Sequence, residues 1–278
     1  MKTYFKPLTY LAMLTLVLIA CSSDDAINTD NSNATNTPGV TELHEAFDDF
    51  NPTNTTITLN GNNVVIQTNG LPDHTSPYWS NTTSRTITGP MGNTMTTVSS
   101  TNHPLWVEPT VTSHNQMAPG NIDDFNGSYS LTVSATPTLA SSSTATGLGP
   151  IGISVSGSVI YNDEEGPNIP LDNAVGSLDY TAAHTGPQSY HYHLEPKAWS
   201  NNDTALIGII ADGFFLYGRK CDASGTYPTD LDASGGHTST TQHTTTPEYH
   251  YHIQNELYLN QFYVLFPGDY QGTPNTIQ

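Results

Sequence analysis

An internal repeat constrains this chain more than any other feature of its sequence. The segment LDYTAAHT at 178–185 precedes YHYH at 190–193, and LDASGGHT at 231–238 precedes YHYH at 249–252. The spacer between the histidine of the first part and the YHYH differs in length, five residues from His184 to Tyr190 and eleven from His237 to Tyr249. Agreement at so many positions indicates a duplicated unit, each copy of which carries one Asp and three His.

The alternation of Tyr and His fits an extended strand. Side chains that follow one another along a strand point to opposite faces, so His191 and His193 share one face and Tyr190 and Tyr192 share the other. Two imidazoles on one face can converge on a single cation, and an Asp or a third His can complete its ligand set. The repeat therefore predicts a metal site, for which the donor types favour copper or zinc.

The candidate site residues follow from the repeat. The predicted metal ligands are His184, His191, His193, His237, His250, His252, Asp179 and Asp232. The predicted hydrogen-bonding partners behind these ligands are Tyr190, Tyr192, Tyr249, Tyr251 and Asp212. One shared site and two separate sites both fit the pattern. The alternative is structural: the imidazoles bond to carbonyls or carboxylates in half-buried strands, and Asp212 is an Asp-Gly turn residue.

Short apolar stretches separated by Gly, Pro and Asn indicate the fold class. TTITLNG, NVVIQTNG, SYSLTVSA and IGISVSGSVIYN are typical of strands, and long stretches with helical periodicity are missing. We expect an all-β fold, a sandwich or barrel-like single domain with Gly-, Pro- and Thr-rich loops. TLNGNNVVI predicts a hairpin that turns at Gly61, and HEAFDDF predicts one short helix.

The amino terminus is typical of an exported protein. Lys2 and Lys6 precede the apolar run LAMLTLVLIA, which is too short to span a membrane and predicts a signal peptide over residues 1–20. LIAC resembles the lipobox of bacterial lipoproteins, which implies that Cys21 carries lipid, palmitate included, and anchors the chain in the outer membrane. SSDD after Cys21 resembles a surface-export signal and implies that the chain faces the exterior. The alternative is an ordinary signal peptide with an accidental cysteine.

The rest of the chain divides by composition. Residues 21–45 are polar and have too little apolar surface to offset chain entropy, so we expect a disordered tether there. Residues 46–139 are predicted to form an accessory β half, and residues 140–278 the domain that holds the duplicated unit. If Cys21 is lipidated, Cys221 is the only thiol left, so an intramolecular disulfide is excluded.

The charge of the chain limits its partners. Without Lys2 and Lys6, four basic residues remain against 25 acidic ones, which leaves a charge near −21. Phosphate backbones would be repelled, so we expect no nucleic-acid partner. A glycan or a small-molecule substrate stays open, and the sequence does not address the oligomeric state.

Several blocks of the chain resemble the YHYH family. They are TNGLPDH at 68–74, GPIGISVSGSVIYND at 149–163, DNAV at 172–175, YHYHLEP at 190–196, DGFFLYG at 212–218 and LDASGGH at 231–237. The resemblance implies a shared fold and the location of the site, but no reaction. The chain departs from the family in having TAAH where a Cys-Asn pair is frequent, and Phe215 where Pro is frequent.

Three smaller features of the sequence each allow more than one interpretation. Cys221 is either a soft metal ligand or a buried thiol. Asp73, His74 and Trp79 form either a pocket wall or a surface turn. GTYPTDLDASGG is rich in Asp and Gly, but it lacks the alternating carboxylates and closing Glu of an EF-hand.

Two functions from different classes follow. The first is a surface lipoprotein whose duplicated Asp, His and Tyr site binds a transition metal. The second is a secreted enzyme that uses His and Tyr, with or without a metal, on an extracellular glycan or ester.

Overall fold

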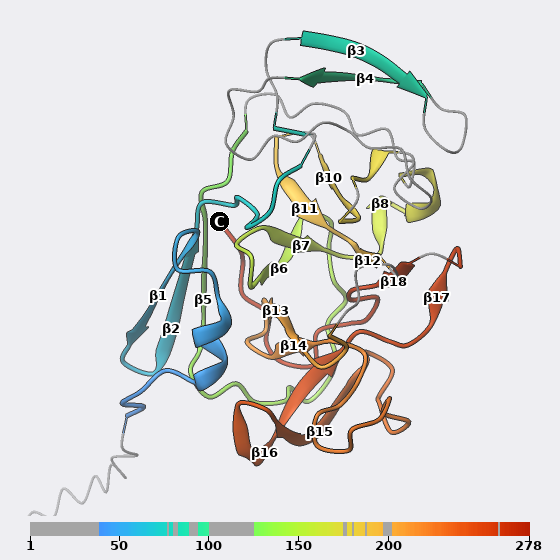
Figure 1. Ribbon diagram of the computed structural model, residues 1–278. Helices are drawn as coiled ribbons and strands as arrows, with labels where there is room; N and C mark the ends of the chain where they lie inside the picture. The colour runs from blue at the N-terminus through green and yellow to red at the C-terminus, as the bar shows by residue number, and fades with distance from the viewer. Residues whose placement is uncertain are drawn as a thin grey trace, which may run out of the picture. The chain divides into compact units, whose positions relative to one another are not determined.

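The computed structural model of the protein is built almost wholly from β-strands (Figure 1). The residues that it describes are 39–76, 78–79, 83–88, 94–99, 125–174, 177–179, 181–186, 188–196, 202–260 and 262–278. The predicted signal peptide 1–20, Cys21 and most of the predicted tether lie outside them. Several sheets are present and none of those described closes on itself, so the all-β prediction is confirmed and the sandwich is favoured over the barrel.

The largest sheet has eight strands, and its order is symmetric about its centre (Figure 1). Across the sheet the strands are β10 (Ala183–Thr185), β11 (Tyr190–Tyr192), β7 (Val159–Tyr161), β6 (Pro150–Ser154), β13 (Leu206–Ile210), β14 (Phe215–Tyr217), β16 (Thr244–His252) and β15 (Gly236–Thr241). In each half a hairpin, β6–β7 or β13–β14, pairs in parallel with the strand that carries YHYH. The duplication seen in the sequence is therefore a duplication of four strands.

The two halves join through the antiparallel pair β6 and β13. Ile153 lies opposite Ile209 in this pairing, and Gly152 and Gly208 lie on either side of that point. A Cβ atom on Gly208 would come within 2.3 Å of the Ile153 carbonyl oxygen, and one on Gly152 within 2.7 Å of the Ile209 carbonyl oxygen. Both glycines are therefore required by the close approach of the two backbones.

The smaller sheets flank this one. A three-stranded sheet contains β1 (Thr55–Asn60), β2 (Asn63–Thr68) and β5 (Tyr129–Ser134), and another contains β12 (Leu194–Pro196), β18 (Phe262–Val264) and β17 (Leu257–Tyr258). Two-stranded sheets are formed by β3 (Thr83–Thr88) with β4 (Thr94–Ser99) and by β8 (Glu164–Gly166) with β9 (Ile169–Pro170). The short helices are η1 (Glu45–Asp49) and η3 (Leu171–Asn173), both of the 3-10 type.

One hydrophobic core joins the predicted accessory half to the rest. Phe47, Ile66 and Leu131 from the amino-terminal half belong to the same buried cluster as Ile153 and Leu216 of the large sheet. Because the two halves share this core, they form a single structural domain.

The amino-terminal elements match their predicted types. The β1–β2 hairpin turns at Gly61, which has a φ of 60°, and η1 occupies the predicted helix. The compact unit begins at Gly39, inside the predicted tether 21–45. His44 caps η1 through its Nδ1 atom, and its Nε2 atom lies 3.1 Å from the Glu248 carboxylate on β16.

Among the helices that the structure describes, none has the length and apolar character needed to cross a bilayer.

The glycine contact at the centre of the large sheet can be tested directly. We expect Gly208→Ala to lower the free energy of unfolding by about 2–4 kcal/mol, because a backbone carbonyl blocks the new methyl group. Gly147→Ala is the control: its Cβ meets no atom within 4 Å, and its change should stay within about 0.5 kcal/mol. Urea denaturation of both variants measures the effect, and equal stabilities would contradict the assigned β6–β13 contact.

Candidate metal centres

The histidines that the two copies of the repeat share lie in two separate clusters. The first cluster consists of His184, His191 and His193, and the second of Cys221, His237, His250 and His252. Within each cluster one ligand atom per residue lies within 4.8 Å of all the others. The clusters lie toward opposite edges of the large sheet, and with four strands between them they are on the order of 20 Å apart. The structure thus has two sites rather than one shared site.

Strand register builds the first cluster. His184 on β10 lies directly opposite His191 on β11, and His193 projects from the same face as His191 one pleat further on. The Nε2 atoms of His191 and His193 are 3.1 Å apart. Tyr161 stacks flat on the His191 ring at a centroid distance of 3.8 Å, which holds that ring in place.

The hydrogen bonds of the Nδ1 atoms fix the tautomers of this cluster. His191 Nδ1 donates to the Ser189 carbonyl at 3.2 Å, and His193 Nδ1 donates to the Asn162 carbonyl at 2.5 Å. His184 Nδ1 donates to the Ser177 hydroxyl, whose own proton goes to the Ala174 carbonyl. Because carbonyl oxygens only accept, each Nδ1 carries the proton and each Nε2 presents a lone pair to the centre of the cluster.

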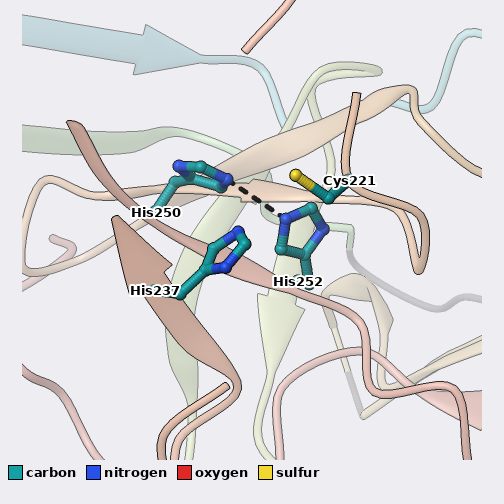
Figure 2. A group of neighbouring side chains, drawn as sticks. All are labelled: Cys221, His237, His250 and His252. Carbon is teal, nitrogen blue, oxygen red and sulfur yellow. Dashed lines mark hydrogen bonds between the residues drawn. The ribbon is translucent and has the colours of Figure 1, made fainter. Parts of the chain in front are cut away.

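The second cluster repeats this arrangement. His237 on β15 lies opposite His250 on β16, and the Nε2 atoms of His250 and His252 are again 3.1 Å apart. Figure 2 shows the three rings and the Cys221 sulfur gathered around one point. The Nδ1 atoms donate to the carbonyls of Glu248 and Gly218 and to the Asp230 carboxylate, which leaves the Nε2 atoms for a cation. The Nε2 atom of His237 also lies 3.3 Å from the Ser239 hydroxyl.

Burial keeps the imidazoles of the two YHYH segments neutral. Desolvation lowers the pKa of His193 to about 4 and that of His250 to about 3, with the neighbouring rings of each cluster adding to the shift. The same causes hold the pKa of His191 well below its ordinary value and bring that of His252 to about 4. Neutral imidazole is the form that binds metal, so the rings are ready to do so at neutral pH.

The two aspartates of the repeat lie elsewhere than predicted. Asp179 accepts hydrogen bonds from the Tyr190 hydroxyl, the Ser76 hydroxyl and Thr181, and neither it nor Asp232 belongs to a cluster. Asp232 likewise accepts from the Tyr249 hydroxyl at 2.7 Å and from the amides of Ser234 and Gly236. These carboxylates organise the turns that deliver His184 and His237 rather than serving as ligands.

The turn after each aspartate has the same backbone conformation. Ala182 and Gly235 occupy equivalent positions and have positive φ angles of 62° and 82°. Their amides donate to the carbonyls of Asp179 and Asp232, and the aspartate amides in turn bond to the carbonyls of Ala183 and Gly236. The four residues between Asp and His in L-D-x4-H thus form one hydrogen-bonded turn, and the histidine of the cluster follows directly after it.

The tyrosines and Asp212 lie on the other face of their strands. Tyr251 donates to Asp212 at 2.6 Å, and the Tyr192 hydroxyl is 2.6 Å from His74 Nε2. Asp212 faces Tyr251 and the amides of residues 271 and 272, so the structure does not place it against the histidines. Of the predicted hydrogen bonds to metal ligands, those from Tyr190 to Asp179 and from Tyr249 to Asp232 are present, whereas Tyr251 bonds to Asp212.

Two further side chains lie beside the cluster histidines, Glu165 at the first cluster and Cys221 in the second. Glu165 on β8 was missed from the sequence; its Oε1 atom lies 3.1 Å from His184 Nε2 and 3.4 Å from His193 Nε2. Cys221, considered both as a ligand and as a buried thiol, is a free, buried thiol inside the second cluster. A longer repeat in the sequence could have pointed to both residues. Its copies are IGISVSGSVIY at 151–161 and IGIIADGFFLY at 207–217, and Glu165 and Cys221 each lie four residues after the last Tyr of a copy.

The remaining candidate residues from the sequence pack against aromatic side chains or bond to the second cluster. Trp79 is buried against Tyr190 and Phe125, and His74 packs against Tyr190 and Tyr192. In the Asp- and Gly-rich segment, Asp230 bonds to His237, which ties that carboxylate to the second cluster.

The depressed pKa values predict how the metal-free protein responds to acid. Folded histidines with a pKa near 4 resist protonation, whereas the unfolded value is about 6.5, so stability is complete above pH 6.5 and is lost as pH falls toward 4. For His252 alone we expect a loss of about 2 kcal/mol in the free energy of unfolding between pH 6.5 and 5. Urea denaturation at several pH values measures this slope. His252→Asn should have a shallower slope, and an unchanged slope would contradict the assignment.

Comparison with known proteins places the first cluster within a family. A model of the family described as YHYH protein matches residues 128–229, which include the first cluster and Cys221 but end before His237. No curated protein and no solved structure matches the chain. The resemblance predicted from the sequence is confirmed over residues 128–229, which match the YHYH family model.

Proposed function

We propose that this protein is a cell-surface lipoprotein that binds one transition-metal ion in each of its two histidine clusters. The observation that carries the proposal is the pair of Nε2 atoms in each cluster. They lie 3.1 Å apart, and neither has a proton to share because both Nδ1 atoms are committed to carbonyls. Two lone pairs at this distance repel each other unless a cation lies between them.

The spacing suits a metal ion. Nitrogens bound at about 2.0–2.1 Å in a tetrahedral arrangement lie about 3.3 Å apart, close to the separation in both clusters. His184 Nε2 supports the same conclusion, because this buried atom faces the Glu165 carboxylate at 3.1 Å and a cation there could be bound by both groups.

The donor types favour copper or zinc. Imidazole nitrogens suit zinc, copper, iron and nickel, whereas magnesium and calcium require mainly oxygen ligands. A bound ion would also join the short edge strands β10 and β15 to their neighbours. Since Cys221 has no described disulfide partner, metal binding would stabilise the fold in a way that disulfides do in other exported proteins.

The enzyme alternative has one observation in its favour. A cavity of about 220 Å³ is lined by Asp73, Thr181, Tyr192 and Glu195 among other residues, and it could admit part of a glycan or ester. No cluster histidine is among the described residues that line it. The Tyr192 hydroxyl on its wall is 2.6 Å from His74 Nε2, but this His–Tyr pair lies outside both clusters, so catalysis at this cavity would leave the cluster imidazoles without a role.

The location is proposed from the amino terminus. LIAC ends an apolar run after two lysines, which supports lipidation of Cys21 after removal of residues 1–20, and SSDD supports exposure at the outer face of the outer membrane. A palmitate analogue supplied to growing cells should label the wild-type protein and not Cys21→Ala. The variant should also leave the membrane fraction, and labelled Cys21→Ala would contradict the proposed anchor.

Metal stoichiometry tests the main proposal. Wild-type protein loaded with zinc and freed of excess ion should retain two equivalents by elemental analysis. His191→Ala and His250→Ala should each retain one and the double variant none, because each substitution removes one ligand of a separate cluster. Loss of both ions from either single variant would contradict two independent sites, and wild type without metal would contradict metal binding altogether.

A matched control separates ligands from their supports. Asp232→Asn keeps the size of the side chain and lies outside both clusters, so it should retain two zinc equivalents even if its free energy of unfolding falls. Loss of one equivalent in this variant would restore Asp232 as a ligand.

A further inference from the structure

The geometry points to a fourth ligand in the first cluster. We infer that Glu165 occupies there the position that Cys221 occupies in the second cluster, so that one domain holds two metal ions of different chemical class. The first site, with three imidazoles and a carboxylate, suits zinc or another divalent ion of similar hardness. The second, with three imidazoles and a thiolate, suits copper. This inference rests on the proposed function, because it assigns the ligand sets of the same two sites.

The equivalence of Glu165 and Cys221 follows from the fold. Gly157 and Gly213 close the hairpins β6–β7 and β13–β14, and both have positive φ, 112° and 94°. The YHYH strands then pair in matching register: Tyr192 lies opposite Ile160 in the first half, and Tyr251 lies opposite Leu216 in the second.

The backbone carbonyls that follow continue the match. Asn162 accepts from His193 Nδ1 in the first half, and Gly218 accepts from His252 Nδ1 in the second. Three residues further along the chain stand Glu165 and Cys221. Both residues take part in a small antiparallel pairing. Glu165 lies in β8, which pairs with β9, and Cys221 forms an isolated bridge with Thr226.

The surroundings of Glu165 indicate a ligand. Its Oε1 atom is buried, lies 3.1 Å from His184 Nε2 and 3.4 Å from His193 Nε2, and makes no hydrogen bond among the described residues. The Nδ1 atoms of His184 and His193 already make hydrogen bonds, to Ser177 and Asn162, so their Nε2 atoms are the ones that face this carboxylate oxygen. A cation bound by all three groups fits this arrangement.

Cys221 has the corresponding surroundings. It is only 2% exposed, and its sulfur lies within 4.8 Å of ligand nitrogens of all three histidines in the second cluster. Its one described polar contact is with the Ser239 hydroxyl at 3.4 Å. Thiolate is a soft ligand that favours Cu(I) and also binds zinc, whereas carboxylate favours harder ions. The exchange of one ligand therefore changes the class of ion that each half prefers.

Cobalt titration of the full mature chain tests the ligand sets. A thiolate bound to Co²⁺ gives a charge-transfer absorption that imidazole and carboxylate do not give. Wild type should bind two Co²⁺ and show this absorption from one of them, and Cys221→Ser should lose it. Glu165→Cys should double the absorption. Glu164→Cys, one residue away on the opposite face of β8, is the matched control and should leave the absorption at the wild-type level.

The outcomes separate the two proposals. If Glu165→Cys binds two Co²⁺ with unchanged absorption, the inference fails and metal binding stands; if wild type binds no Co²⁺, the proposed function itself fails. Glu165→Gln provides a second measurement should the cysteine variant not fold. It should weaken zinc binding at the first site at least tenfold and leave the second site unchanged, and equal affinities would overturn the inference.

Competition between metals tests the assignment of ions. One equivalent of Cu(I), added under reducing conditions to protein that holds two zinc ions, should displace one zinc. In wild type the displaced ion should come from the second site, so His250→Ala should release none. Cys221→Ser should reduce the preference for copper at least tenfold. Displacement divided equally between His191→Ala and His250→Ala would overturn the assignment.

Discussion

The antiparallel contact between β6 and β13 is the interaction on which the rest of the structure depends. It joins two four-stranded halves about Ile153 and Ile209, and it forms only because Gly152 and Gly208 allow the backbones to approach closely. Each half then places its YHYH strand in parallel beside its own hairpin. One central pairing thereby sets the positions of two sites at opposite edges of the sheet.

Within each half the backbone, rather than other side chains, orients the YHYH imidazoles. His191, His193, His250 and His252 all donate from Nδ1 to main-chain carbonyls. One of these carbonyls lies in β16, and the other three lie directly beside the ends of β7, β11 and β14. The strands restrain them, so the rings are held before any ion arrives and little conformational entropy is lost on binding. The carbonyl contacts that the structural alternative predicts are therefore present; they engage Nδ1 and leave the Nε2 atoms of each pair facing one another.

The sequence predicted the parts of this arrangement that obey local periodicity. Alternation along the strand placed the two histidines of each YHYH on one face, and the spacing of L-D-x4-H singled out His184 and His237, which the structure brings into the two clusters. It misplaced Asp179 and Asp232, because spacing alone does not reveal that a carboxylate turns back toward the tyrosine face. Glu165 escaped notice because it reaches its cluster through a hairpin, and only the longer repeat around Gly152 and Gly208 relates it to Cys221.

The location of the clusters explains why a metal would matter to this fold in particular. β10 has only three residues and forms one edge of the large sheet, so backbone pairing alone holds it weakly. His184 on that strand faces His191 across the pairing and Glu165 from β8, so an ion bound by all three would tie three separate segments together. β15 and His237 stand in the same relation at the other edge. In a chain whose described part contains a single free thiol and no disulfide, ion binding would tie both edge strands to the sheet, the three-residue β10 as well as the six-residue β15.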